Sequence, residues 1–437
     1  MKNHSFKIAS LGIQHVLAMY AGAVIVPLIV GGALGLSSKD LTYLVSIDIL
    51  MCGVATLLQV YRNKFMGIGL PVMLGCTFTA VAPMIAIGGE YGITSIYGSI
   101  IVSGLIVMII SQFFGKMVRF FPPVVTGSVV TIIGITLIPV AINNLAGGSG
   151  SADYGSLPNL ALGFGTLLLI IIIYKFSTGF MRSISVLIGL IVGTVIAFFM
   201  GQVDVTSIGE ASWFHMPTPF YFGMPTFHIT PIIIMTLVAI VSLVESTGTY
   251  FALSDICDKK VKEEELAKGY RAEGAASVLG GIFNSFPYTT FSQNVGLIQI
   301  SGVKTRNVIY TAATFLILFG LIPKIGALVT VVPSSVLGGA MVAMFGMVIA
   351  AGIKMLSQVN FNSQENLLII ACSVGIGMGV TVAPELFAQL PKNLNILTNN
   401  GIVVGSITAI ILNIIFNEIG LKKKQQVVQD SFVSEQK

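Results

Sequence analysis

Charge is the scarcest property of this sequence. Asp, Glu, Lys and Arg together make up 9% of its 437 residues, whereas hydrophobic residues make up 54%. Soluble domains carry about 25% charged residues, so the composition excludes an ordinary soluble protein and predicts an all-α polytopic protein in the lipid bilayer. The net charge of +5 is carried by lysines in predicted loops, and we expect no nucleic-acid partner.

Cysteine is rare as well. Cys52, Cys76, Cys257 and Cys372 stand singly in apolar segments, without the paired spacings of a metal site or a disulfide framework. The sequence also lacks a grouping of His, Cys and Asp that would hold a catalytic metal or activate a nucleophile. We therefore expect no enzyme activity, no metal and no cofactor.

Hydrophobic segments long enough to cross a bilayer follow one another along the chain. Cytoplasmic loops collect Lys and Arg, and with the N-terminus inside only Lys39, Lys324 and Lys392 of the 23 fall outside. This pattern predicts fourteen spans in the cell membrane with both termini cytoplasmic. The predicted spans are residues 11–33, 41–60, 67–88, 94–114, 123–143, 158–176, 183–201, 230–253, 270–283, 287–302, 306–326, 332–353, 364–380 and 399–417.

Two of these spans share an interruption. In the third span Pro71 stands seven residues before Phe78, and in the tenth span Pro287 stands seven residues before Asn294. Such paired, interrupted segments in the two halves of a chain are typical of inverted-repeat transporters, whose binding site lies between the two breaks. The alternative is that Pro and Gly are simply common in membrane helices.

The tenth span contains the most informative segment, in which Gln293 and Asn294 stand side by side among apolar residues. Polar groups in hydrocarbon cost several kcal/mol each when unpaired, so this segment must line a cavity or pack inside protein. The Gln293 amide offers donors and an acceptor together, which suits the edge of a purine or pyrimidine. Asn294 suits bonds to backbone freed at the break.

Ionisable residues inside predicted spans are further candidates, because charge at membrane depth is costly and usually functional. Glu245 lies in the middle of the eighth span and could bind a ring N–H or carry a proton; a protonated or ion-paired structural glutamate is the alternative. His15 could contact a ligand or serve only in packing. Asp48 and Glu273 lie nearer the ends of their spans, where ordinary interfacial charges also occur. Phe78 could stack on a planar ring, worth about 1–3 kcal/mol, or be one more apolar residue.

The segment Gln293-Asn294-Val295-Gly296-Leu297-Ile298-Gln299-Ile300-Ser301-Gly302 resembles the signature of the nucleobase-ascorbate transporter family, with Ser301 in the place of Thr. The resemblance covers essentially the whole chain before its polar tail. Four further motifs carry it, namely Gln14-His15, Glu245, Arg271-Ala272-Glu273-Gly274 and Gly75-Cys76-Thr77-Phe78.

The resemblance implies a seven-plus-seven inverted repeat with short β-strands in the third and tenth spans, which would account for Pro71 and Pro287. The implied core domain comprises residues 1–120 (spans 1–4) and 230–327 (spans 8–11), and the gate domain residues 121–205 (spans 5–7) and 328–420 (spans 12–14). Residues 206–229 would form an extracellular loop and residues 421–437 a cytoplasmic tail. Bacterial members are often homodimers.

By the same resemblance, Glu245, Gln293, Phe78, Gly296 and Thr77 bind the base, and Glu245, His15 and Glu273 serve proton coupling. Asn294, Ser301, Gln14, Pro71 and Pro287 have motif or structural roles. Thr249 occupies a place where some relatives carry an ionisable residue, so coupling would depend more on Glu245. The implied activity is import of a purine base by proton symport with alternating access.

Gln at the first signature position is similar to the xanthine and urate branch of the family, whereas uracil carriers tend to have Glu there. Xanthine is thus the first expected substrate, urate the second and uracil the third. An anion exchanger or channel of the same architecture is a remote alternative, because a basic or dipole-lined site would be expected for it and this chain offers a glutamate.

Overall fold

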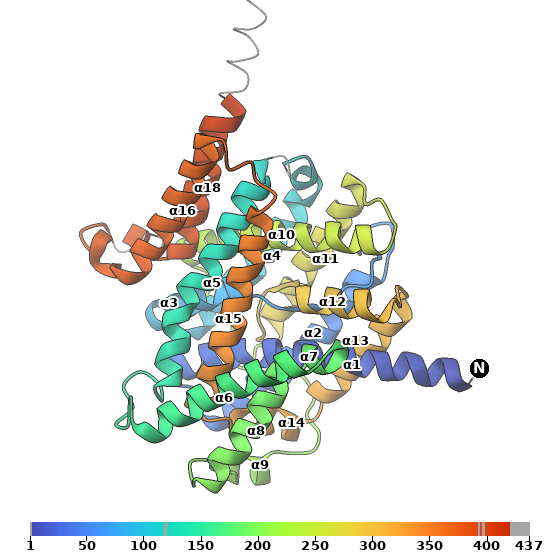
Figure 1. Ribbon diagram of the computed structural model, residues 1–437, viewed down its shortest axis with the longest axis vertical. Coiled ribbons are helices and arrows are strands. Elements are labelled where there is room, and N and C mark those ends of the chain that lie inside the picture. Colours follow the sequence, from blue (N-terminus) through green and yellow to red (C-terminus); the bar gives the residue numbers. More distant parts are fainter. Residues whose placement is uncertain (1, 118–119, 392–393, 396–397, 420–437) are drawn as a thin grey trace, which may run out of the picture. The chain divides into compact units, whose positions relative to one another are not determined.

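The computed structural model describes residues 2–117, 120–391, 394–395 and 398–419. The predicted tail, residues 421–437, lies outside these ranges. Helices dominate the described chain, and two short strands interrupt them (Figure 1). The elements are α1 (Lys2–Ala33), α2 (Ser38–Val60), β1 (Leu74–Cys76), η1 (Phe78–Ala80), α3 (Val81–Tyr91), α4 (Ile93–Met117), α5 (Pro123–Leu145), α6 (Leu157–Phe176), α7 (Gly179–Ser183), α8 (Ser185–Phe199), α9 (Thr206–Glu210), α10 (Ile229–Ile256), α11 (Glu263–Ile282), β2 (Tyr288–Thr290), α12 (Ser292–Ser301), α13 (Arg306–Gly320), α14 (Pro323–Thr330), α15 (Ser334–Leu356), α16 (Gln364–Val382), η3 (Pro384–Phe387), α18 (Gly401–Asn413) and the π-helix η4 (Ile414–Ile419).

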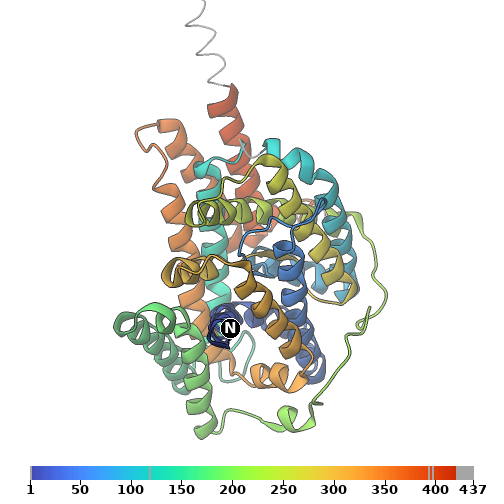
Figure 2. The same cartoon turned by 90° about the vertical axis from the view of Figure 1, so that its right-hand side faces the viewer.

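The chain divides into two compact units. The first comprises residues 1–115 and 137–346, and the second residues 116–136 and 347–437, so that the three boundaries fall within helices α4, α5 and α15. In the first unit, α2 packs against α1, α11, α13 and α14, and α6 packs beside α8 (Figure 2). In the second unit, α16 and α18 lie side by side (Figure 1). The core and gate boundaries expected from the sequence remain a prediction.

The two short strands lie in the first unit and join segments far apart in the sequence. β1 and β2 pair antiparallel, with Leu74 opposite Thr290, Gly75 opposite Thr289 and Cys76 opposite Tyr288. Gly75 is required here because a Cβ atom at this position would lie 2.1 Å from the ring of Phe291. The expected strands in the third and tenth spans are thus present.

Both strands lead directly into short helices. β1 is followed by η1 and α3, and β2 by α12, which ends where Gly302 adopts a left-handed conformation with φ of +64°. Glycine adopts this conformation without the steric penalty of a Cβ atom, which explains the last residue of the signature segment. At each break, a short strand followed by a half-helix therefore takes the place of one continuous membrane helix.

The number of spans is not settled by helix length. Within the described residues, nine helices are long and apolar enough to cross a membrane, and α13 and α14 form a further pair bent by 80°. The continuous spans predicted at 67–88 and 287–302 are instead strands with short helices, and the one predicted at 306–326 is divided between α13 and α14. A criterion of helix length does not count half-helices, so the total of fourteen membrane spans stays a prediction.

The predicted loop 206–229 contains α9 and then a long extended segment (Figure 2, light green). The segment is held to the first unit by hydrogen bonds: the Tyr43 hydroxyl donates to the Thr218 carbonyl at 2.9 Å, and the Phe220 N–H donates to the Ile282 carbonyl at 2.9 Å. These bonds attach the loop to α2 and to the end of α11.

Candidate functional site

The strand pair brings three candidate ligand-binding residues onto elements that pack together. Phe78 begins η1, Gln293 lies in the first turn of α12, and Glu245 lies on α10, which contacts η1, β2 and α12. Phe78, Gln293 and Glu245 are each partly exposed, although the chain around them is largely buried. The structure thus places the predicted base-binding side chains around the ends of the two strands.

Glu245 and Gln293 carry polar side chains without a hydrogen-bond partner among the described residues, and the Thr79 and Thr290 hydroxyl oxygens nearby share this property. Within the described ranges, no side chain or backbone group forms a hydrogen bond with either one. Buried and half-buried polar groups in proteins are nearly always paired, so two exceptions on helices that contact each other are candidates for binding an external partner. A carboxylate accepts hydrogen bonds, and an amide both donates and accepts them.

Gly296 lies one helical turn after Gln293 and therefore on the same side of α12. It is partly exposed, and a Cβ atom at this position would have no other atom within 4 Å. Open space next to Gln293 agrees with the expected role of Gly296 in leaving room for a ligand.

Aromatic rings lie beside this space. The Phe78 ring centroid lies 5.5 Å from that of Phe345 in an edge-to-face arrangement and 6.4 Å from that of Phe291. Phe291 was missed by sequence reasoning, although it immediately follows β2 and its ring covers Gly75. The signal for it was its position two residues before Gln293. Neither contact is a parallel stack, so the Phe78 ring is held by its neighbours without being stacked face to face on either of them.

Thr77, Pro71 and Pro287 are buried and serve the shape of the breaks. The Thr77 N–H donates to the Pro287 carbonyl at 2.9 Å, and its Oγ1 lies 3.2 Å from Ser242 Oγ and accepts from the Thr79 N–H at 3.2 Å. These bonds hold β1 against β2 and α10. Direct contact of Thr77 with a ligand remains a prediction.

Asn294 connects α12 to α1. Its Nδ2 donates to the His15 carbonyl at 2.8 Å and lies 3.1 Å from His15 Nδ1, and both residues are buried. Asn294 thus braces the break against α1 rather than bonding to its own helix, and this contact occupies His15. Ser301 Oγ accepts from the Val303 N–H at 3.3 Å beyond the helix end. Gln14, next to His15, is partly exposed.

Glu273 lies at the centre of a buried network. Tyr250 and Ser246 of α10 donate to its two carboxyl oxygens, Ser246 at 3.0 Å, and Gln59 of α2 donates to the Tyr250 hydroxyl. Ser246 Oγ also lies 3.1 Å from Thr289 Oγ1 on β2. The network therefore joins Glu273 to the residue next to Glu245 and to the strand pair. Sequence reasoning missed Gln59, Ser246 and Tyr250, whose buried polar side chains gave no motif.

The expectation that Asp48 and Glu273 could be interfacial charges is wrong. Their exposed fractions are 0% and 2%, because α2 and α11 pack against each other and against the strands. Segment ends inferred from hydropathy mark the membrane boundary poorly where helices are covered by protein.

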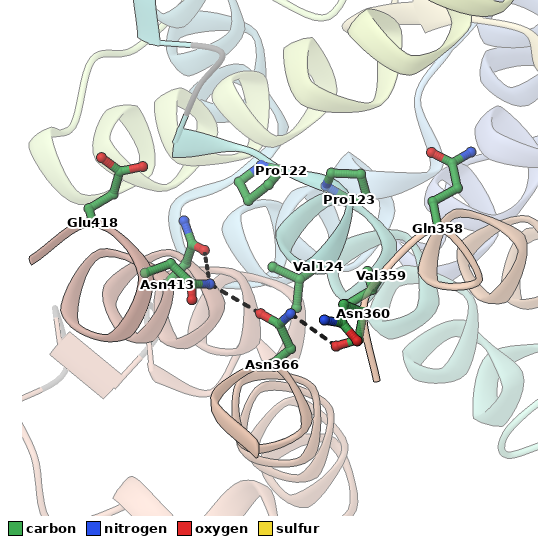
Figure 3. Close-up of a pocket in the computed structure, with 10 residues that line it drawn as sticks. Pro122, Pro123, Val124, Gln358, Val359, Asn360, Asn366, Asn413 and Glu418 are labelled. Carbon is green, nitrogen blue, oxygen red and sulfur yellow. Dashed lines mark hydrogen bonds between the residues drawn. The ribbon is translucent and has the colours of Figure 1, made fainter. Parts of the chain in front are cut away.

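A separate cavity of about 270 Å³ lies in the second unit and contains none of the predicted site residues. Asn366 of α16 and Asn413 of α18 lie near each other in its lining (Figure 3), which also includes Asn417 of η4. Asn417 Nδ2 donates to Asn366 Oδ1 at 3.1 Å and to Asn413 Oδ1 at 2.9 Å, and Asn366 Nδ2 donates to the Asn360 carbonyl at 3.2 Å. These amides are largely bonded to each other.

Comparison with known proteins assigns the chain to a protein family. Residues 6–386 match the model of a family described as the Permease family. The chain belongs to this permease family. It is 64% identical to the xanthine permease of Bacillus subtilis (strain 168) over 437 residues, which covers 100% of this chain and 99% of that protein. The chain is a transporter of the membrane and not an enzyme, and the resemblance stated from its motifs is confirmed.

Other permease relatives are nearly as similar. The nucleobase transporter PlUacP of Paenibacillus larvae is 63% identical, with 96% of each chain covered, and the uric acid permease PucK of Bacillus subtilis is 59% identical, with 95% of this permease and 96% of that one covered.

Among solved structures, the transmembrane domain of the cyanobacterial bicarbonate transporter BicA superposes with a TM-score of 0.61 at 16% identity, covering 85% of this chain and 96% of that domain. This likeness establishes the fold and carries no information about the substrate.

Proposed function

We propose that this permease imports a purine base, with xanthine as its main substrate, by proton symport with alternating access. Glu245 and Gln293 bind the polar edge of the base, Phe78 stacks on its face, and Gly296 leaves room for it. The observation that carries the proposal is the pair of unpartnered polar side chains, Glu245 and Gln293, on packed elements beside the strand pair.

The choice of xanthine is supported by the match to a xanthine permease over the full chain and by Gln at position 293. Urate is the second candidate, since two-ring bases share the same edge and the uric acid permease PucK is 59% identical. Uracil is third. The anion alternative has only the shared fold in its favour, and the basic or dipole-lined site expected for an anion exchanger or channel is replaced here by a glutamate.

Uptake of radiolabelled xanthine tests the proposal in cells that lack their own purine permeases. We expect saturable uptake that unlabelled xanthine inhibits best, urate next and uracil least. Equal or better inhibition by urate would assign the permease to urate, and the absence of any base uptake would contradict the proposal as a whole.

Coupling to protons is supported by the two carboxyl groups, Glu245 and Glu273, and the buried network that joins their surroundings. We expect acid pulses outside the cell to drive uptake, a protonophore to abolish it, and removal of sodium to leave it unchanged. Uptake that depends on sodium and does not respond to a protonophore would identify sodium, and not the proton, as the coupling ion.

The cytoplasmic placement of both termini and the homodimer also belong to the proposal. The one-sided distribution of Lys and Arg supports the former, and the family resemblance supports the latter. A reporter enzyme that is active only in the cytoplasm, fused to the C-terminus, tests the orientation. Crosslinking of the purified permease in detergent tests the dimer, and a monomer at all concentrations would contradict it.

A further inference from the structure

Asp48 is the most unusual charged residue that the proposed transport mechanism leaves unused. Its side chain lies in the middle of α2 with an exposed fraction of 0%, and among the described residues no Lys or Arg forms an ion pair with it. A buried carboxylate without a cation is stable only if neutral donors surround it. The identity of these donors shows what Asp48 holds.

The strongest donor comes from the turn that leads into β2. Ser285 donates to Asp48 Oδ1 at 2.6 Å, and the Ser285 hydroxyl also lies 2.6 Å from that of Tyr288, the first residue of β2. The Cys76 thiol of β1 donates to the Ala23 carbonyl of α1 at 3.1 Å, so Asp48 reaches β1 through the pairing of the two strands. Cys76 and Tyr288 are directly paired across the sheet.

Cys52, one turn after Asp48 on α2, completes the surroundings with its Sγ 4.0 Å from Asp48 Oδ2. Two thiols and a carboxyl group could suggest a metal, but no group of three such side chains within the described residues has the arrangement to hold one. The cluster is therefore a hydrogen-bonded anchor.

We propose that Asp48 is a positioning residue for base recognition: from α2 it holds the strand pair at the register that places Phe78 and Gln293. Phe78 follows Cys76 by two residues, and Gln293 follows Tyr288 by five. A two-stranded pair of three residues each is too short to fix its own position, so an external anchor decides where the following half-helices begin. This inference rests on the proposed function for its substrate.

The Asp48→Asn variant tests the anchor. Asn keeps the size and one acceptor but turns an NH₂ donor toward groups that themselves donate, so the strands must shift. We expect the KM for xanthine to rise about 10-fold, the size of one hydrogen bond to a charged group, with nearly unchanged maximal rate and membrane abundance. Ser285→Ala should give a smaller increase, and Asp48→Asn with Ser285→Ala should raise KM by less than the product of the single effects, because the two act through one contact. Asp40→Asn is the matched control, because Asp40 lies on the same helix and accepts hydrogen bonds from Ser37 and Tyr221, neither of which belongs to the strands.

The alkylation rate of the Cys76 thiol reports on the position of β1 and does not depend on a transport assay. In a variant with Cys52→Ala, Cys257→Ser and Cys372→Ser, Cys76 is the remaining thiol and is fully buried. Buried thiols react slowly. We expect Asp48→Asn to speed alkylation of Cys76 by N-ethylmaleimide about 10-fold, in line with the weakened anchor.

The two measurements separate the outcomes. Raised KM together with faster alkylation supports the proposal. Unchanged alkylation overturns it whatever the KM, because the strands have then not moved, and faster alkylation with unchanged KM overturns the link to recognition. If the parent permease fails to take up xanthine, the proposed function fails, while the alkylation rate still decides whether Asp48 holds the strands.

Discussion

The site at the strand pair and the asparagine-lined cavity of the second unit differ in how their polar groups are paired. In the cavity, Asn366, Asn413 and Asn417 bond to one another, whereas Glu245 and Gln293 have no partner among the residues that the structure describes. Amides that satisfy one another gain little from a ligand, because binding would break bonds already made. The comparison teaches that unpaired polar groups, more than the presence of a cavity, mark the place of recognition here.

The largest effect is expected from Glu245, because its replacement removes a charged group that has no partner among the described residues. Glu245→Gln keeps the shape but loses the charge, and a hydrogen bond to a charged group is worth about 1.5–3 kcal/mol, or roughly 10- to 100-fold in affinity. Glu245→Ala should abolish measurable uptake at unchanged membrane abundance. Glu263→Gln, on the exposed first turn of α11, is the control for a generic loss of charge. Normal xanthine uptake by the Glu245→Ala variant would show that Glu245 does not bind the base. It would also contradict the comparison between the two regions.

Tyr250→Phe removes one donor to Glu273 and tests whether the buried network serves coupling. Ser246 still donates to Glu273, so we expect the protein to fold and binding to persist, while proton-driven accumulation falls about 10-fold through loss of one charge-assisted bond. The measurement compares accumulation driven by a pH gradient with equilibrium exchange of labelled xanthine, which needs no net proton movement.

Tyr270→Phe is the matched control, because the Tyr270 hydroxyl is also buried but bonds to Thr247 at 2.6 Å. Equal losses in both variants would show that any buried hydroxyl matters equally and that the Glu273 network has no special role.

Gln293→Glu tests whether the side chain at position 293 contacts the base. The variant replaces an amide that donates and accepts hydrogen bonds with a carboxylate that only accepts them. We expect the order of competing bases to change, with xanthine weakened roughly 10-fold relative to other bases, since a mismatched hydrogen bond costs about 1–3 kcal/mol. Gln299→Glu makes the same change on an exposed residue of α12 and should leave the order as it is. If both variants keep the original order, Gln293 does not contact the base.

Sequence alone predicted most of the candidate site residues because they carry local signals. Pro71 and Pro287 indicate the breaks, the amides at 293 and 294 stand in an apolar span, and Glu245 is a charge at membrane depth. The two short strands were expected from the family resemblance, and the structure contains them and places Glu245, Gln293 and Phe78 on elements that pack together.

The remaining residues had no local signal because their roles depend on partners distant in sequence. Tyr250 and Gln59 meet only when α2 and α10 pack, and Asp48 acquires its donors from a turn more than half the chain away. Hydropathy placed Asp48 near a span end, whereas packing of α2 among other helices buried it completely. Burial in a membrane protein is thus decided by neighbours and not by position along a span.

The smallest effect on transport is expected in the asparagine-lined cavity, where the comparison predicts a structural role. Asn417→Ala removes a donor of the π-helix η4 and leaves two acceptors without it, Asn366 Oδ1 on α16 and Asn413 Oδ1 on α18. We expect about 1–2 kcal/mol less stability, seen as a lower unfolding temperature in detergent, with the KM for xanthine unchanged. Gln358 is an exposed residue that lines the same cavity, and Gln358→Ala should change neither the unfolding temperature nor the KM for xanthine. A raised KM in Asn417→Ala with no loss of stability would mean that paired amides also recognise the base, and the distinction between the two regions would then fail.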